Sequence, residues 1–190
     1  MSIVAAKSVV VSDDNGALLA AAARGHQASW NELVRRYNSL LWSIARSFRL
    51  STQDASDVVQ NTWLRLVENL DRIRDPERLG AWLGTAARRE CLQHLRRNAR
   101  HTKDVPAEGL AELADEGPGV DASLLLEERD AELWLAVSKL SDRCAQLLRV
   151  LMASPPPSYA DVAEILGMPV GSIGPNRIRC LEHLRKLVGP

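Results

Sequence analysis

Two neighbouring stretches carry side chains suited to bind a partner or a nucleic acid rather than to catalyse a reaction. In the first, STQDASDVVQNTWLRLVENL, polar residues share one side of a predicted helix with a single leucine, Leu64. These polar residues are Asp57, Gln60, Asn61 and Glu68. A lone leucine there is either an ordinary surface residue or a small apolar anchor inside a polar rim. Composition alone leaves both interpretations open.

The second stretch, DPERLGAWLGTAARRECLQHLRRNAR, is strongly basic. From Arg72 to Lys103 there are nine Lys or Arg and three Asp or Glu, so nine minus three gives a net charge of plus six. One side of the predicted helix carries Arg89, Gln93, Arg96, Arg97 and Arg100. Such a stripe is typical of a phosphate-binding face, and the alternative is an ordinary solvated face.

Helix-start signals position both stretches. Ser51 and Asp54 form a capping box that predicts a helix from Thr52, with an apolar face of Val59, Trp63, Leu66, Val67 and Leu70. Asp75 as cap and a first-turn Pro76 predict the next helix. Its inward side chains are predicted to be Leu79, Leu83, Ala86, Ala87, Cys91 and Leu95.

Two earlier helices complete a predicted four-helix domain. One of the three residues from Asp13 to Asn15 caps a short helix over 17–24, which Gly25 ends. Ser29 and Glu32 form a second capping box, which starts a long amphipathic helix ending near residue 50. Four such helices can bury one core.

The C-terminal part is predicted to contain a helix-turn-helix. A helix over 124–140 precedes one capped by Ser141. Ser158 and Asp161 then cap a short helix that Gly167 ends, and Ser172 is predicted to cap the last one. In this motif the first turns of the second helix meet base edges in the major groove. The residues in that position are Ser172, Gly174, Pro175, Asn176, Arg177 and Arg179.

Composition bounds the remaining possibilities. The 190 residues suit two small helical domains in an all-α fold, and the net charge of zero hides an acidic block. Residues 104–132 hold ten acidic residues and one basic residue. We therefore predict a disordered tail over 1–12, a helical domain over 13–100, a flexible acidic linker over 101–123 and the helix-turn-helix domain over 124–190.

Several classes of site and location are not expected. Cys91, Cys144 and Cys180 are far apart without CxxC spacing, so neither zinc nor a disulfide is predicted, and buried free thiols are the default. There is no Ser, His and Asp constellation, glycine-rich phosphate loop or metal-ligand cluster, so no enzyme activity and no cofactor are expected. No stretch resembles a signal peptide or a membrane span, which predicts a cytoplasmic protein.

The pattern DASDVVQNTWLRL followed by AWLGTAARRECLQHLRR resembles region 2 of the bacterial sigma-70 family, in its extracytoplasmic-function (ECF) group. The C-terminal helix-turn-helix independently resembles sigma region 4, which reads the minus-35 promoter element. Together the two resemblances cover residues 17–100 and 127–188. They imply a factor that binds core RNA polymerase, recognises two promoter elements and directs transcription initiation.

The resemblance also assigns expected roles to residues. The residues that the resemblance implies for docking on the β′ clamp helices are Asp57, Gln60, Asn61 and Leu64. Asn61 replaces the glutamate that is more usual at this position in the family. In the family, recognition of the minus-10 element includes one base flipped into a pocket. The residues that the resemblance implies for this role are Arg74, Arg78, Trp82, Arg88, Arg89, Arg96 and Arg97. Arg89 stands where the family often has asparagine, and arginine there suits a phosphate better than a base. Minus-35 recognition falls on the six residues named above.

The implied partners are core RNA polymerase through its β′ clamp helices and β flap, promoter DNA, and an anti-sigma factor. Two other classes of function stay open. A helix-turn-helix regulator would bind DNA tightly without polymerase and would not use the face around Leu64. A helical adaptor would bind proteins only, so that changing Arg96 and Arg97 would leave its activity unaltered.

Overall fold

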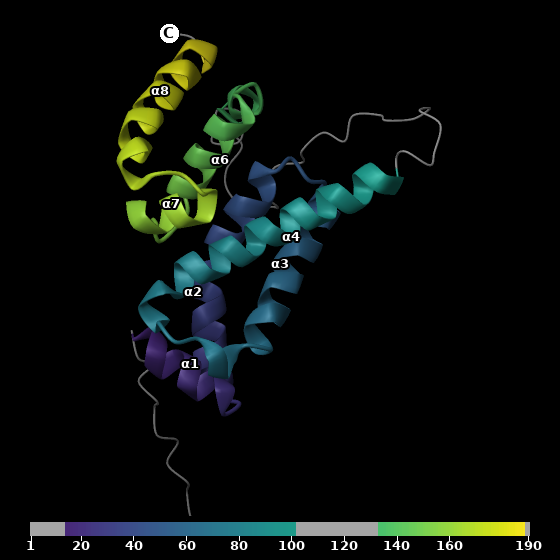
Figure 1. Ribbon diagram of the computed structural model, residues 1–190, viewed down its shortest axis with the longest axis vertical. Helices are drawn as coiled ribbons and strands as arrows, with labels where there is room; N and C mark the ends of the chain where they lie inside the picture. Colours follow the sequence, from purple (N-terminus) through teal and green to yellow (C-terminus); the bar gives the residue numbers. More distant parts are fainter. Residues whose placement is uncertain (1–13, 102–132, 189–190) are drawn as a thin grey trace, which may run out of the picture.

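The computed structural model describes residues 14–101 and 133–188, among which there are helices and no strand (Figure 1). The predicted all-α class is confirmed. The predicted tail, the acidic linker from residue 102 onward and the beginning of the helix predicted from residue 124 lie outside the described residues. Residue 101, predicted to belong to the linker, ends a helix instead.

The N-terminal part has four α-helices, as predicted. They are α1 (Asn15–Ala23), α2 (Gln27–Ser47), α3 (Thr52–Val67) and α4 (Leu79–His101), with two 3₁₀ turns, η1 (Leu70–Arg72) and η2 (Pro76–Arg78), before α4. Helix α1 begins where the Asp14 carboxylate accepts from two backbone N–H groups, and it is followed by Gly25 at φ 82°. Ser51 caps α3 by accepting from the N–H of Asp54.

One apolar core joins these helices. Its largest fully buried side chains are Leu18, Leu33, Leu41, Ile44, Leu66, Leu79 and Leu83. Trp30 of α2 and Trp63 of α3 meet edge to face, with ring centroids 5.7 Å apart. Since all four helices contribute to this core, α3 and α4 are held at fixed positions and present their polar sides outward.

The C-terminal part contains helical residues 133–138, α6 (Asp142–Leu151), α7 (Tyr159–Leu166) and α8 (Val170–Val188). The predicted capping box of Ser158 and Asp161 starts α7, and Gly167, at φ 65°, ends it in the left-handed conformation. Ser141 caps α6 as predicted. Buried Ile165 and Ile173 hold the two helices of the helix-turn-helix against the core.

Three predicted helix starts are wrong. The side chain of His26, rather than Ser29, caps α2, and Ser29 lies buried in its first turn. Asp75 makes no capping hydrogen bond, and η2 precedes α4. Ser172 lies inside α8, where its hydroxyl donates to the carbonyl of Pro169 at 2.7 Å. In each case a residue whose side chain can cap a helix lies in or next to the first turn, but the helix begins at a different residue.

Two side chains predicted to face inward are exposed instead. They are Val67 at 51% and Leu95 at 39%. Val67 is the last residue of α3, and the C-terminal end of α4 extends past the neighbouring helices (Figure 1). Helical periodicity locates an apolar side of a helix but does not reveal how far the partner helix reaches along it.

The prediction of free thiols is wrong for two of the three cysteines. Cys144 of α6 and Cys180 of α8 form a disulfide, with their Cα atoms 5.3 Å apart across a sequence separation of 36 residues. Packing of α6 against α8 brings them within the range that a disulfide requires. Cys91 is a free, buried thiol as predicted, and burial raises its pKa to about 12.

The two groups of helices pack against each other through α2 with α6 and α4 with α7. Arg49 donates from Nη2 to the carbonyl of Leu140 at 2.9 Å and forms an ion pair with Asp142. Gly84 of α4 leaves room for the buried Ile165 of α7. A hydrogen atom in place of a side chain at residue 84 is therefore what allows the helices to approach.

We expect Gly84→Ala to open this contact. The added Cβ would lie 2.5 Å from Cδ1 of Ile165 and 2.6 Å from its Cγ1, so α7 must shift. The expected result is a loss of about 1–3 kcal/mol in the free energy of unfolding and a larger radius of gyration. Urea unfolding and small-angle scattering measure the two effects.

Gly171→Ala is the matched control, because no atom of the described residues, apart from its chain neighbours and the backbone of its own helix, lies within 4 Å of its added Cβ. Higher helix propensity should make that variant more stable by up to about 1 kcal/mol, with unchanged dimensions. If Gly84→Ala proves as stable and as compact as Gly171→Ala, the packing of α4 on α7 does not hold in solution.

Candidate nucleic-acid interface

The outer face of α3 is open to solvent. The predicted docking residues Asp57, Gln60, Asn61 and Leu64 are all exposed, with Leu64 at 53%. The opposite side is closed, since Ala55, Val58, Val59, Thr62 and Leu66 are buried. The fold of the N-terminal helices therefore does not require an apolar residue at position 64.

Val67 joins Leu64 on this surface, one turn further along α3. It is 51% exposed and is followed by Glu68, which is exposed as well. Sequence reasoning assigned Val67 to the core and missed it. We call the surface formed by Asp57, Gln60, Asn61, Leu64 and Val67 the α3 face. A pair of apolar side chains at i and i+3 inside a polar rim is suited to protein contact.

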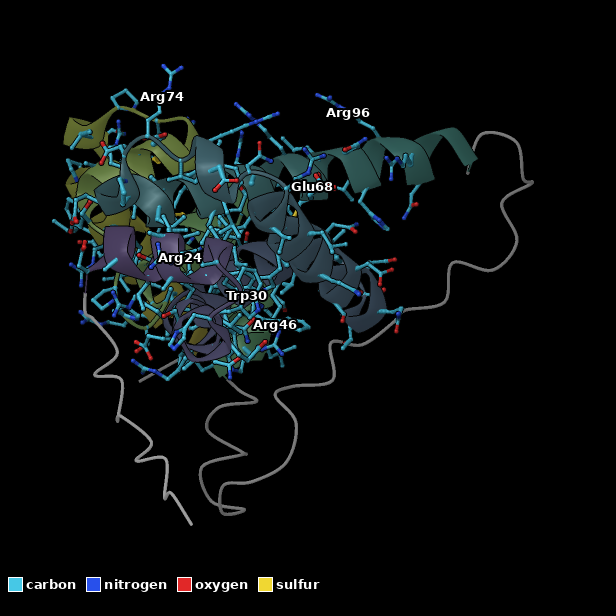
Figure 2. All side chains as sticks on the ribbon, turned by 90° about the horizontal axis from the view of Figure 1, so that it is seen from below. Arg24, Trp30, Arg46, Glu68, Arg74 and Arg96 are labelled. Carbon is cyan, nitrogen blue, oxygen red and sulfur yellow. A yellow bond between two sulfur atoms is a disulfide. The ribbon has the colours of Figure 1, made fainter. Side chains whose placement is uncertain are left out.

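Helix α4 presents its arginines unequally. Arg89, Arg96 and Arg97 are exposed. Arg88 is half-buried, and its Nε is buried without a hydrogen-bond partner among the described residues. Arg74 in the preceding loop is exposed, and Figure 2 shows Arg74 and Arg96 projecting from the same edge of the molecule. Phosphates can therefore reach the loop and the outer part of α4 from one side.

The loop between α3 and α4 is held by a hydrogen-bond network that reaches back to α1. Asn15 Nδ2 donates to the carbonyl of Pro76 at 3.1 Å and to the Tyr37 hydroxyl at 2.8 Å. Arg36 Nη1 donates to Asn15 Oδ1 at 3.1 Å. One asparagine thus ties three segments together: the start of α1, the middle of α2 and η2.

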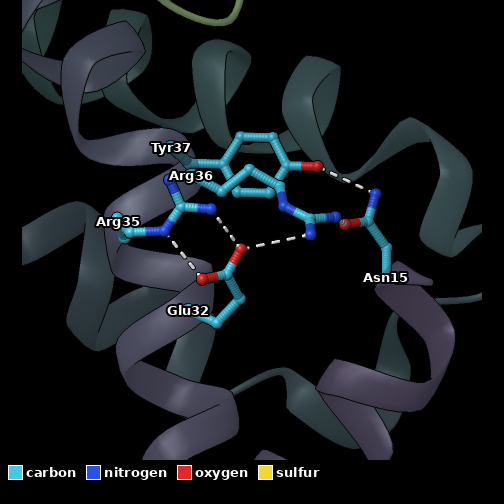
Figure 3. A network of polar contacts seen from close by, with 5 residues as sticks. All are labelled: Asn15, Glu32, Arg35, Arg36 and Tyr37. Atoms are coloured by element: carbon cyan, nitrogen blue, oxygen red, sulfur yellow. Dashed lines mark hydrogen bonds and ion pairs between the residues drawn. The ribbon is translucent and has the colours of Figure 1, made fainter. Parts of the chain in front are cut away.

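The cationic side of this network is fixed by a carboxylate (Figure 3). Glu32 accepts from Nε and Nη2 of Arg35 and from Nη2 of Arg36. These contacts, the hydrogen bond from Arg35 first, lower the pKa of Glu32 to about 2. The two arginines thus stabilise the ionised carboxylate, which in turn holds Arg36 where it donates to Asn15.

Replacing Asn15 by Ala should loosen the loop before α4. Loss of hydrogen bonds to Pro76, Tyr37 and Arg36 is expected to cost about 1–3 kcal/mol in the free energy of unfolding. It should also raise hydrogen exchange over residues 72–78. Asn31→Ala is the control, because within the described residues the one hydrogen bond of the Asn31 side chain is accepted from Gln27 on the exposed side of α2. Equal exchange in both variants would show that Asn15 does not hold the loop.

The other two predicted minus-10 residues near this loop are less free. Trp82 is half-buried and packs against the core. Arg78 forms an ion pair with Glu164 of α7. Arg78 Nη2 is therefore occupied by Glu164, and a phosphate approaching Arg78 would have to compete with that carboxylate for this nitrogen.

In α8 the predicted base-reading side chains contact their own motif. Asn176 donates from Nδ2 to the carbonyl of Ser172 at 2.7 Å, and its Oδ1 accepts from Arg179 at 2.9 Å. Arg177 donates to the Tyr159 hydroxyl at 3.2 Å. Adenine readout by asparagine uses both ends of the amide, so Asn176 must exchange these contacts before it can read a base.

The start of α8 differs from the prediction in a way that affects this site. The helix begins at Val170, so Gly174 and Pro175 lie in its second turn rather than its first. Pro175 has no N–H to offer the carbonyl of Gly171. Apart from its chain neighbours and the backbone of its own helix, no atom of the described residues lies within 4 Å of a Cβ added at Gly174. Gly174 and Pro175 therefore place little side-chain bulk between the backbone of α8 and the groove of a DNA that approaches this side.

A cavity of about 250 Å³ opens between α8, α7, α6 and helical residues 133–138. Its lining is mostly apolar, and Arg149 lies over the Trp134 ring, 4.5 Å from the centroid. The lining includes Leu133, Val137, Leu148, Met152, Leu181 and Leu184. The sequence did not predict this cavity, because its walls come from segments that are separate in the chain, including the loop between α6 and α7 with Pro156 and Pro157.

Among residues 14–101 and 133–188, no group of three or more His, Cys, Asp or Glu is placed to hold a metal ion. Within the same part of the chain, no helix has both the length and the apolar character needed to cross a bilayer.

Comparison with known proteins shows the family. A family model for sigma-70 region 2 matches residues 33–101. The ECF RNA polymerase sigma factor EcfG of Rhodopseudomonas palustris is 32% identical over 148 residues, which are 78% of this chain and 78% of EcfG. The chain belongs to the ECF sigma factors. Sigma factor CnrH of Cupriavidus metallidurans is 30% identical over 171 residues, covering 85% of this chain and 87% of CnrH.

Solved structures of ECF sigma factors share the fold. The sigma factor RpoE from Bartonella quintana, solved with the anti-sigma factor NepR, has a TM-score of 0.67 at 25% identity. The alignment covers 84% of this chain and 96% of RpoE. CnrH solved with the cytosolic domain of CnrY gives a TM-score of 0.61 at 26% identity, over 93% and 97% of the two chains. This ECF sigma factor thus matches its relatives over both helical parts.

Proposed function

We propose that this ECF sigma factor binds core RNA polymerase through the α3 face and directs it to promoters with a minus-10 and a minus-35 element. The observation that supports docking most directly is the exposure of Leu64 and Val67 beside Asp57, Gln60 and Asn61. The core of the N-terminal helices is complete without these side chains. A polymerase coiled coil on this face would bury two apolar anchors within a polar rim.

We propose that the minus-10 element lies along the loop before α4 and the basic side of α4. Arg74, Arg89, Arg96 and Arg97 would neutralise phosphates, and Trp82 with Arg88 would form one wall of the base-binding pocket. Arg78 would join them once its pair with Glu164 opens. The N-terminal residues 13–100 would thus form the unit that docks on polymerase and opens the duplex.

We propose that α8 reads the minus-35 element with Ser172, Gly174, Pro175, Asn176, Arg177 and Arg179. Arg177 is exposed and suits bidentate pairing with guanine. The apolar cavity between α6 and α8 would receive the β flap of the polymerase, whose contact should be a helix with apolar side chains. Residues 124–190 would form this second unit, and the acidic linker, which starts after α4 and so covers 102–123, would connect the two.

The remaining assignments follow from this role. The protein would act in the cytoplasm, as an initiation factor without enzymatic activity or cofactor. We infer that an anti-sigma factor binds it, as NepR and CnrY are found with two similar sigma factors. Both the α3 face and the cavity in the C-terminal part expose apolar side chains that such an inhibitor could cover.

The alternative is a helix-turn-helix regulator that binds DNA without polymerase. Fluorescence anisotropy with labelled promoter fragments separates the two functions. We expect the chain alone to bind duplex DNA weakly and with little sequence preference, and the chain on core polymerase to bind selected promoters tightly. Tight, sequence-specific binding by the chain alone, with no measurable affinity for core polymerase, would contradict the sigma-factor function.

A further inference from the structure

The disulfide encloses the helix-turn-helix. The chain segment between Cys144 and Cys180 contains most of α6, all of α7 and the first half of α8. The link joins the first turn of α6 to the middle of α8, so it fixes the recognition helix to a helix of the underlying core. Constraining such a loop restricts the ways in which α8 can move away from α6.

The two linked cysteines differ in burial. Cys144 is half-buried, whereas Cys180 is only 5% exposed. Cys91, the third cysteine, is fully buried in the N-terminal core and has its thiol pKa raised to about 12. A thiol reacts with oxidants as thiolate, so the burial and raised pKa of Cys91 disfavour its oxidation at neutral pH. The chain thus holds one half-buried cysteine with a resolving partner beside it, and one cysteine outside the pair.

We propose that Cys144 and Cys180 form a reversible thiol–disulfide site that is oxidised by hydroperoxides. The thiolate of Cys144 attacks the peroxide O–O bond and gives a sulfenic acid and water. The thiolate of Cys180 then attacks that sulfur, forms the S–S bond and releases a second water. Two thiols and one hydrogen peroxide become one disulfide and two waters, and a cellular dithiol restores the thiols by exchange.

The expected cellular location of the protein favours a regulatory disulfide between Cys144 and Cys180 over a permanent one. Given the proposed function, the protein works beside RNA polymerase, where thiols are normally kept reduced. Disulfides in such compartments are mostly transient and redox-sensing. This step rests on the proposed function, whereas the chemistry at Cys144 and Cys180 does not.

Oxidation would act on two binding surfaces. Leu181 and Leu184 of α8 and Leu148 of α6 line the apolar cavity, each within four residues of a linked cysteine. Arg177 and Arg179 lie three residues and one residue before Cys180 on the recognition helix. The disulfide therefore holds both the cavity walls and the base-reading side chains in place, and reduction releases them together.

Thiol counting on the full chain tests the site. After treatment with hydrogen peroxide and denaturation, maleimide labelling should modify one cysteine, Cys91, and after dithiothreitol it should modify all three. Cys91→Ser should still lose two labels on oxidation, while Cys144→Ser and Cys180→Ser should form no intramolecular disulfide. Peroxide that leaves all three cysteines labelled, or a bond that dithiothreitol cannot reduce in the folded chain, would overturn the proposal.

The functional consequence has separate readouts. Reduction should lower the unfolding midpoint of the C-terminal helices by about 5–15 °C, raise hydrogen exchange in α8, and reduce polymerase-dependent transcription several-fold. Cys144→Ser should behave as the reduced protein under all conditions. Identical exchange and transcription in both redox states would refute regulation by the pair. If neither redox state supports transcription while thiol counting succeeds, the proposed function fails and the thiol–disulfide site stands.

Discussion

Replacing Leu64 by Asp is expected to weaken binding to core RNA polymerase by about 30-fold or more. An apolar anchor at the centre of an interface contributes roughly 2 kcal/mol or more, and aspartate would add the cost of removing a charge from water. Because Leu64 is 53% exposed in the free protein, its replacement should change the free energy of unfolding by no more than about 0.5 kcal/mol. Fluorescence-detected titration of the labelled sigma factor with core polymerase measures the affinity.

Leu135→Asp is the control for this substitution. Leu135 is 59% exposed on helical residues 133–138 and does not line the apolar cavity. The Leu135→Asp variant carries the same added charge at a similarly exposed leucine. The affinity of this variant for polymerase should match that of the unaltered protein. Val67→Asp should resemble Leu64→Asp. Unchanged polymerase affinity in Leu64→Asp, with helicity retained, would exclude the α3 face as the docking surface.

Replacing both Arg96 and Arg97 by Ala is expected to remove two phosphate contacts from promoter binding. The dependence of log affinity on log salt concentration should become shallower by about 2 for the complex with polymerase. At physiological salt the loss should be roughly tenfold or more, and it should be similar for all promoters, since phosphates carry no sequence information. Filter binding at several salt concentrations gives the slope.

The matched control for the arginine pair is Arg24→Ala combined with Arg143→Ala. Both are exposed and lie in α6 or at the end of α1, so the control removes the same net charge elsewhere. It should leave the salt slope unaltered. A similar reduction in slope for both double variants would mean that overall charge, rather than the basic side of α4, accounts for promoter affinity.

Local signals predicted most of the fold. The start of α3 at Ser51 and the limits of α7 at Ser158 and Gly167 were predictable because each boundary depends on side chains or φ angles within a few residues. The start of α2 was not, since His26 and Ser29 both have capping chemistry and the buried position of Ser29 decides between them. That burial depends on tertiary packing, which local pattern does not contain.

Contacts between distant segments were the part that sequence reasoning missed. The Cys144–Cys180 disulfide depends on how α6 and α8 pack, and the 36-residue separation has no diagnostic spacing. The ion pair of Arg78 with Glu164 depends on the packing of α4 on α7. For the candidate site, helical periodicity predicted the exposure of the α3 face. The hydrogen bond from Asn15 to Pro76 could not be predicted, because it joins residues 61 apart in the chain and no local pattern indicates it.

Run-off transcription with purified core polymerase on a pool of genomic promoter fragments tests the sigma-factor function most directly. The account predicts new transcripts from a restricted set of fragments, whose start sites align to common minus-10 and minus-35 elements. It also predicts that Leu64→Asp abolishes these transcripts and Leu135→Asp does not. Transcription that is the same with and without the protein, under conditions where it is folded, would contradict the account.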